Sequence, residues 1–151
     1  MTVKKDGGQP QPKAETVEGM ERKLHKLADD AAELRKEQDV VDMRAEYDAV
    51  VEHGVGRVTK VELNAHVPGL PVVVLARPQT RPEQKRYDDM VVLGGKASYV
   101  KAAKLLADTC RVYPSEEVFK RMVEADPGIV TTLGNRLVAR AQGKKVAEEK
   151  D

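Results

Sequence analysis

Three histidines and one cysteine are the side chains that most often carry chemistry, and their spacing predicts neither a metal site nor a catalytic centre. His25, His53 and His66 fall on different expected elements, and none has a Cys, Asp or Glu at the spacing of a known metal-binding motif. Cys110 ends an apolar helical stripe, where a buried thiol is the usual outcome, whereas a nucleophile would need a nearby histidine. We therefore expect no catalytic residue, no metal and no cofactor.

Adjacent acidic residues and glycine-rich stretches also lack the pattern of an active site. Asp88 and Asp89 are neighbours on an expected helix, so their side chains diverge by about 100° and do not share a proton. The glycines of GVG (54–56) and LGGK (93–96) lack the strand–loop–helix setting, and the Lys and Ser/Thr spacing, of a phosphate-binding loop. We interpret them as solvated charge and as helix ends, and we expect a protein that is not an enzyme.

The composition favours a cytoplasmic protein that binds neither nucleic acid nor a membrane. The 151 residues include 26 basic and 25 acidic side chains, a net charge of +1, which gives no overall field to attract a polyanion. A single cysteine excludes an intramolecular disulfide and suits a reducing compartment. The N-terminal stretch lacks the apolar segment of a signal peptide, and the longest apolar run, Leu70–Ala76, is too short to span a bilayer.

Changes in composition along the sequence divide the chain into four parts. Residues 1–16, rich in Gly, Pro, Gln and Lys, predict a disordered tail, and residues 144–151 predict a charged tail. Residues 17–53 contain no proline and are mostly good helix formers, which predicts a long amphipathic helix. Residues 54–143 are expected to form a domain that combines a hairpin with helices.

The expected long helix carries two apolar sets. The first alternates steps of four and three residues, as in helices that pair along a narrow seam, and consists of Met20, Leu24, Leu27, Ala31, Leu34, Gln38, Val41 and Ala45. The second consists of Val40, Met43, Tyr47, Val50 and Val51, and its shift indicates two packing partners along one helix, or two helices. Leu24, Leu27, Leu34 and Val41 are the candidate residues for binding a partner helix or for self-association. The alternative is that they pack on the protein's own domain.

The rest of the sequence predicts a two-stranded hairpin and a series of helices. Val55–Leu63 and Leu70–Ala76 have the pattern of strands, and Pro68 followed by Gly69 favours a type II turn between them. Capping residues and glycines then predict helices at 80–93, after a capping box of Thr80 and Glu83, at 97–111, after Ser115, and from Asp126 to Gly143. The expected fold class is α+β and mostly helical, with a long N-terminal helix, one antiparallel hairpin and about four shorter C-terminal helices.

The stretch from Tyr47 to Gly143 resembles small tailed-phage proteins that serve as tail assembly chaperones. The resemblance lies in the order of its parts: HGVGRVTKVEL, a second strand that ends in Arg77–Pro78, a polar helix, the CRVYPS break and the DPG start of a closing helix. It implies a non-enzymatic factor in the host cytoplasm that binds the tape-measure protein and helps to recruit tail-tube subunits. The long N-terminal helix departs from the pattern of the smallest members, and it would act as a dimerisation arm or a client-binding arm.

Two other interpretations stay open. The first is a permanent structural component of a phage particle, in the tail or the head, which would be present in finished particles in fixed copy number. The second is a minor enzyme subunit or regulator, which a ligand-dependent change in stability would reveal.

Overall fold

The structure, a computed structural model, describes residues 16–63 and 67–143, and the side chains of residues 95–97 are outside that description. The expected tail at 1–16, apart from Thr16, the expected tail at 144–151, and His66 therefore lie outside the described residues. The elements are α1 (Val17–His53), β1 (Thr59–Glu62), β2 (Val73–Ala76), α2 (Arg81–Cys110), β3 (Arg111–Tyr113), α3 (Glu116–Ala125) and α4 (Ile129–Ala141). This order confirms the predicted α+β class, mostly helical with a long N-terminal helix.

The chain divides into two compact units, Met1–Glu33 and Leu34–Asp151. In the first unit, Thr16 caps the start of α1, because its side-chain oxygen accepts a hydrogen bond from the backbone N–H of Gly19 at 2.9 Å. In the second unit, α1 ends at Gly54, whose positive φ of 106° closes the helix as the glycine pattern predicts.

The predicted hairpin is present in the second unit. β1 pairs with β2 in antiparallel register, with Val61 opposite Val74, and the loop contains the expected turn, in which the Leu70 N–H donates to the Val67 carbonyl at 3.0 Å. Gly69 takes the positive φ of 86° that a type II turn requires. Val61 is buried and Lys60 is exposed, as the alternation of residues along the strand predicts.

A third strand joins this hairpin and differs from the sequence expectation. β3, which the sequence pattern presents as a break between helices, pairs antiparallel with β2, so the strand order is β1–β2–β3. β2 becomes the central strand and all four of its residues are buried. The pattern around Val112 is too short to predict a strand, because its hydrogen bonds depend on where α2 returns the chain.

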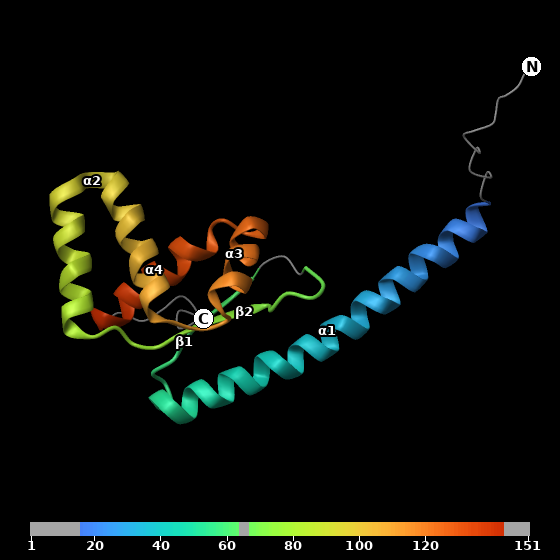
Figure 1. Ribbon diagram of the computed structural model, residues 1–151, viewed down its shortest axis with the longest axis horizontal. Coiled ribbons are helices and arrows are strands. Elements are labelled where there is room, and N and C mark those ends of the chain that lie inside the picture. Colours follow the sequence, from blue (N-terminus) through green and yellow to red (C-terminus); the bar gives the residue numbers. More distant parts are fainter. Residues whose placement is uncertain (1–15, 64–66, 144–151) are drawn as a thin grey trace, which may run out of the picture. The chain divides into compact units, whose positions relative to one another are not determined.

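Helices cover both faces of the sheet in the second unit. One face of β2 contributes Val74 and Ala76 to the main core, whose other residues come mostly from α2, α3 and α4. The opposite face contributes Val73 and Leu75, which pack with Ala49 of α1 in a smaller core. The unit therefore has three layers: residues 34–53 of α1, the sheet, and the remaining helices (Figure 1).

Helix α2 replaces two predicted helices. The sequence favours separate helices on either side of Gly94, whereas the structure has one helix from Arg81 to Cys110 that bends into two arms (Figure 1). Tyr87 and Tyr99 lie on different arms, with ring centroids 6.1 Å apart. Twelve residues of straight helix would separate them by about 18 Å along the axis, so the contact requires the bend.

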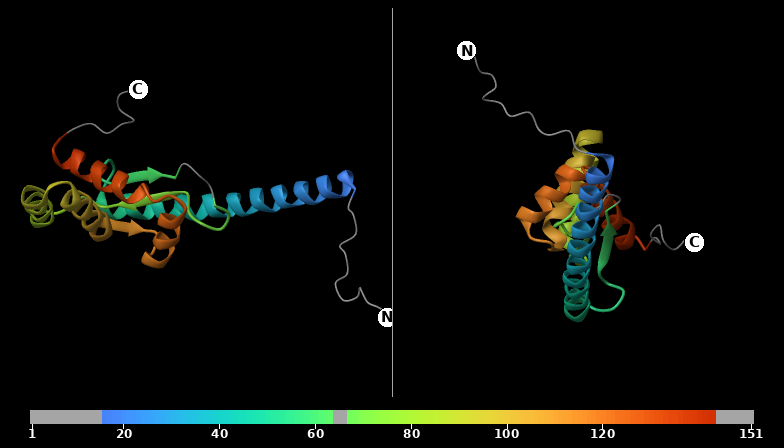
Figure 2. Two further views of the ribbon diagram at one scale, coloured as in Figure 1. Left: turned by 90° about the horizontal axis from the view of Figure 1, so that it is seen from above. Right: turned by 90° about the vertical axis from the view of Figure 1, so that its right-hand side faces the viewer.

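Helix α4 closes the main core by lying against α2 and β1, and the contact with α2 is visible in the left view of Figure 2. A Cβ atom on Gly134 would lie 2.7 Å from the Ala103 carbonyl oxygen, so glycine permits the close approach of the two helices. The predicted start of this helix was wrong: Asp126 is the C-cap of α3, and α4 begins after Gly128.

Candidate functional site

In the second unit, the face of α1 that packs on the sheet consists of polar and small side chains. Asp42 is 4% exposed, and its carboxylate accepts hydrogen bonds from Gln38 Nε2 at 2.8 Å, from the Tyr113 hydroxyl at 2.6 Å and from the Val72 N–H at 3.0 Å. Burial, followed by the hydrogen bond to Asp42, raises the pKa of Tyr113. Ala49, two turns further along α1, completes this face. These bonds pair the buried carboxylate fully, so the contact is specific as well as close.

The other side of the same helix segment is apolar and exposed. Its residues follow steps of three and four and are Val40, Met43, Tyr47 and Val51. At about 100° per residue they lie roughly opposite Asp42 and Ala49 on the helix. Met43 is 70% exposed and Tyr47 is 64% exposed. We call these four residues the outer ridge.

The outer ridge is the second apolar set of the sequence pattern, minus the half-buried Val50. The shift in the apolar pattern at Val40 marks the part of α1 that packs on the sheet. In this part the large apolar side chains are exposed, and the buried face carries Asp42 and Ala49. The signal for this arrangement was Asp42, which follows Val41 and belongs to neither apolar set. Its three partners come from α1 and from positions 30 and 71 residues further along the chain, which sequence spacing does not reveal.

The four residues predicted to bind a partner are all exposed. In the first unit, Leu24 and Leu27 are each 64% exposed on α1. In the second unit, Leu34 and Val41 are exposed as well. Each unit therefore presents apolar side chains of α1, and the outer ridge enlarges the apolar surface of the second one.

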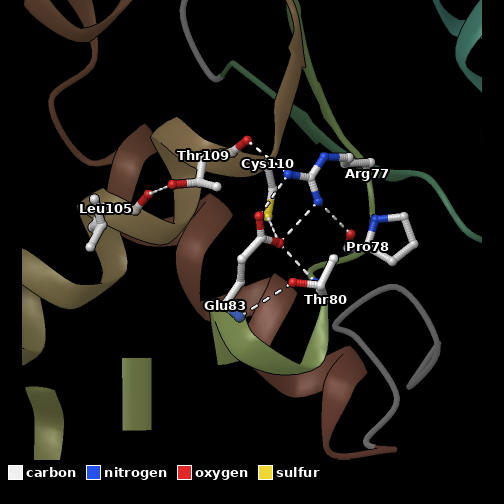
Figure 3. A network of polar contacts seen from close by, with 7 residues as sticks. All are labelled: Arg77, Pro78, Thr80, Glu83, Leu105, Thr109 and Cys110. Atoms are coloured by element: carbon white, nitrogen blue, oxygen red, sulfur yellow. Dashed lines mark hydrogen bonds and ion pairs between the residues drawn. The ribbon is translucent and has the colours of Figure 1, made fainter. Parts of the chain in front are cut away.

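A polar network joins the end of β2 to both ends of α2 (Figure 3). The guanidinium of Arg77 donates two parallel hydrogen bonds to the Glu83 carboxylate, at 3.0 and 2.9 Å, and further bonds to the carbonyls of Pro78 and Thr109. Glu83 also accepts a bond from the Thr80 N–H at 2.8 Å, which forms the capping box that the sequence predicts. The Arg77–Pro78 step thus serves as a structural anchor.

The electrostatics of this network favour stability rather than reactivity. The hydrogen bond from Arg77 lowers the pKa of Glu83 to about 2, so the carboxylate is charged at neutral pH. Burial raises the pKa of the Cys110 thiol to about 11, although Arg77 opposes the shift. A thiol with that pKa is neutral at pH 7 and a poor nucleophile. Cys110 is buried, as its place in the apolar stripe predicts.

The space beside this network is small, and the described part of the chain contains no group of side chains arranged to hold a metal ion. The cavity next to Glu83 and Tyr87 has a volume of about 10 Å³, enough for about one water molecule. Among the described residues, no group of three His, Cys, Asp or Glu side chains is arranged to hold a metal ion. No helix in residues 16–63 and 67–143 has the length and apolar character needed to cross a membrane.

Comparison with known proteins gives no match of any kind. No protein-family model matches the chain, and neither a curated protein nor a solved structure is similar enough to count as a match.

Proposed function

We propose that this protein is a non-enzymatic binding protein that uses exposed apolar residues of α1 to hold a helical segment of a partner protein. The observation that carries the proposal is the outer ridge, which stays exposed while the opposite side of the same helix packs on the sheet. A helix whose own domain takes up only its polar and alanine face retains an apolar face for another molecule.

The chemistry of the ridge favours a helical partner. Apolar side chains at steps of three and four form a stripe that fits the matching stripe of a second amphipathic helix. Met43 and Tyr47 lie at its centre, and both types of side chain are common at binding surfaces because methionine adapts its shape and tyrosine buries a large area. Leu24 and Leu27 offer a similar stripe in the first unit.

The resemblance to tail assembly chaperones makes the proposal more specific. Such a protein binds the tape-measure protein in the host cytoplasm during tail morphogenesis and does not act on nucleic acid or a membrane. A tape-measure protein is long and helical, so its apolar stripes are partners of the kind that α1 can bind. The second candidate is a permanent structural component of the tail or head, and the Arg77 anchor, which gives a stable fold, suits either role.

The first experiment tests the binding surface. We would replace Met43 and Tyr47 together by serine in the tagged full chain. The proteins that this variant captures from producing cells are then compared with those that the wild type captures. The matched control replaces Val92 and Leu93 by serine, since these apolar residues on α2 are even more exposed than Met43 and Tyr47. We expect the α1 variant alone to lose its chief partner while both keep the wild-type melting temperature. Equal capture by all three proteins would rule out the outer ridge as the binding surface.

The second experiment identifies the role of the protein. Tagged protein is recovered from cells that produce phage, its partners are identified by mass spectrometry, and finished particles are assayed in parallel. A long helical tail protein as chief partner, with the bait absent from particles, supports the chaperone. Stoichiometric bait in the particles supports the structural component instead.

A further inference from the structure

A cleft in the second unit lies between the start of β1, the end of α4 and the segment that follows β2. Its volume is about 220 Å³, below the roughly 300–1,000 Å³ of pockets for drug-sized ligands. The lining residues are Gly56, Arg57, Thr59, Pro78, Gln79, Leu137, Arg140 and Ala141. The size fits a small ion or a small polar molecule.

Thr59 gives the first indication of what this cleft binds. Thr59 is 3% exposed. Among the buried side-chain polar atoms of the described residues, only its hydroxyl oxygen has no hydrogen-bond partner. A buried hydroxyl without a partner costs free energy, and such groups are rare in folded proteins. Thr59 is one of the residues that line the cleft, so a ligand that reached its hydroxyl would supply the missing hydrogen bond.

Two arginines give the second indication. Arg57 is exposed and Arg140 is half-buried, and no carboxylate of the described residues forms an ion pair with either of them. Arg140 donates one hydrogen bond to the Gly56 carbonyl, and most of its five donors have no partner among the described residues. The C-terminal end of α4 adds a partial negative charge of about half a unit, and the two guanidinium charges exceed it.

The lining residues therefore include two cations and one hydroxyl that have no ion-pair or hydrogen-bond partner among the side chains of the described residues, and none of the lining residues is acidic. Arginine pairs with oxoanions through parallel hydrogen bonds, and a hydroxyl adds one further donor. We propose that this cleft is a binding site for a small oxoanion, of which inorganic phosphate is the simplest member, held by Arg57, Arg140 and Thr59. The site is separate from the outer ridge and does not depend on the partner-binding function.

Nuclear magnetic resonance of the ¹⁵N-labelled full chain tests this proposal. The protein is titrated with sodium phosphate at constant ionic strength, with sodium chloride as the ionic control. We expect saturable shifts of amide signals around Arg57, Thr59 and Arg140 in phosphate alone. Shifts that do not saturate, or that chloride reproduces, would overturn the proposal and indicate a general salt effect.

Matched variants identify the residues that hold the anion. Arg57→Gln should weaken phosphate binding by roughly tenfold or more, because hydrogen bonds to charged groups contribute the most. Arg136→Gln is the control, since Arg136 lies one turn before Arg140 on α4 and also donates to a backbone carbonyl, that of Lys60 at 2.7 Å, but does not line the cleft. Its affinity for phosphate should be that of the wild type.

Thr59→Val is the second variant, because valine has the shape of threonine without the hydroxyl. It should fold and bind phosphate more weakly than the wild type. Equal affinity of Arg57→Gln, Arg136→Gln and Thr59→Val for phosphate would show that the cleft is not the binding site.

Discussion

Two arginine-containing sites in the second unit differ in how completely their polar groups are paired. Around Arg77, the guanidinium and the Glu83 carboxylate satisfy each other and also bind the backbone at both ends of α2. In the cleft, the Thr59 hydroxyl has no hydrogen-bond partner among the described residues, and Arg57 forms no ion pair with a carboxylate of those residues. The first site is complete in itself, whereas the second has hydrogen bonds left to make.

The difference separates a structural role from a binding role. A polar cluster whose donors and acceptors are all paired holds elements together, and removing one member leaves its partners buried and unpaired. A buried hydroxyl without a partner lowers the stability of the free protein, and a ligand that binds the hydroxyl would restore the lost hydrogen bond. The two sites should therefore respond to substitution in opposite directions.

The largest effect is expected from Glu83→Ala. The substitution leaves Arg77 without its ion-pair partner and removes half of the capping box, so the free energy of unfolding should fall by about 3 kcal/mol. Urea denaturation followed by circular dichroism measures the change. Glu116→Ala is the control, because Glu116 pairs with Lys120 only at the exposed surface and should cost under about 1 kcal/mol. Equal losses in the two variants would contradict a structural role for the Arg77 network.

The same network predicts a dependence of stability on pH. The pKa of Glu83 falls from 4.5 to about 2 in the folded protein, so its stabilising contribution is present above about pH 4.5 and disappears as the pH falls toward 2. At pH 3 the contribution should be about 2 kcal/mol smaller than at pH 6. Urea denaturation of the wild type and of Arg77→Gln at both pH values isolates the contribution of the ion pair to the free energy of unfolding. The loss between pH 6 and pH 3 should be smaller in the variant, and an unchanged loss would argue against the ion pair.

A second completed network, around Asp42, extends the comparison to the other side of the sheet. Tyr113→Phe removes the hydroxyl that donates to Asp42 at 2.6 Å, while Gln38 and the Val72 N–H remain. Loss of one hydrogen bond to a buried carboxylate should lower the free energy of unfolding by about 1.5 kcal/mol. Thermal denaturation measures it. A neutral result would show that Gln38 compensates for the missing hydroxyl.

The smallest effect, and the one of opposite sign, is expected from Thr59→Val in the absence of phosphate. Valine removes the unpaired hydroxyl and suits a strand, so the free energy of unfolding should rise by about 1 kcal/mol. Denaturation in a buffer without oxoanions measures the gain. A loss of stability would indicate that the hydroxyl has a partner after all, and it would remove the contrast between the two sites.

Local signals in the sequence were sufficient for the long helix, the hairpin and several helix ends, but they missed β3, the continuity of α2 and the start of α4. The capping box at Thr80 and Glu83, the turn at Pro68 and Gly69, and the glycine at the end of α1 depend on residues within four positions of one another. Backbone φ preferences and short hydrogen bonds act over that range, so the pattern reveals them directly. The long helix and the α+β class follow from the same signals.

Only the tertiary structure decided which side of α1 is buried and which polar groups have partners. The spacing on α1 marks two apolar sets, but the inward side is chosen by Asp42, whose partner Tyr113 lies 71 residues further along the chain. The cleft likewise joins Arg57 to Arg140 across 83 positions (140 − 57). The sequence by itself determined the long helix, the hairpin, the capping box and the apolar stripes, because those depend on neighbouring residues. The pairing of buried charges and the unpaired hydroxyl of Thr59 depend on contacts between distant segments, which only the folded chain brings together.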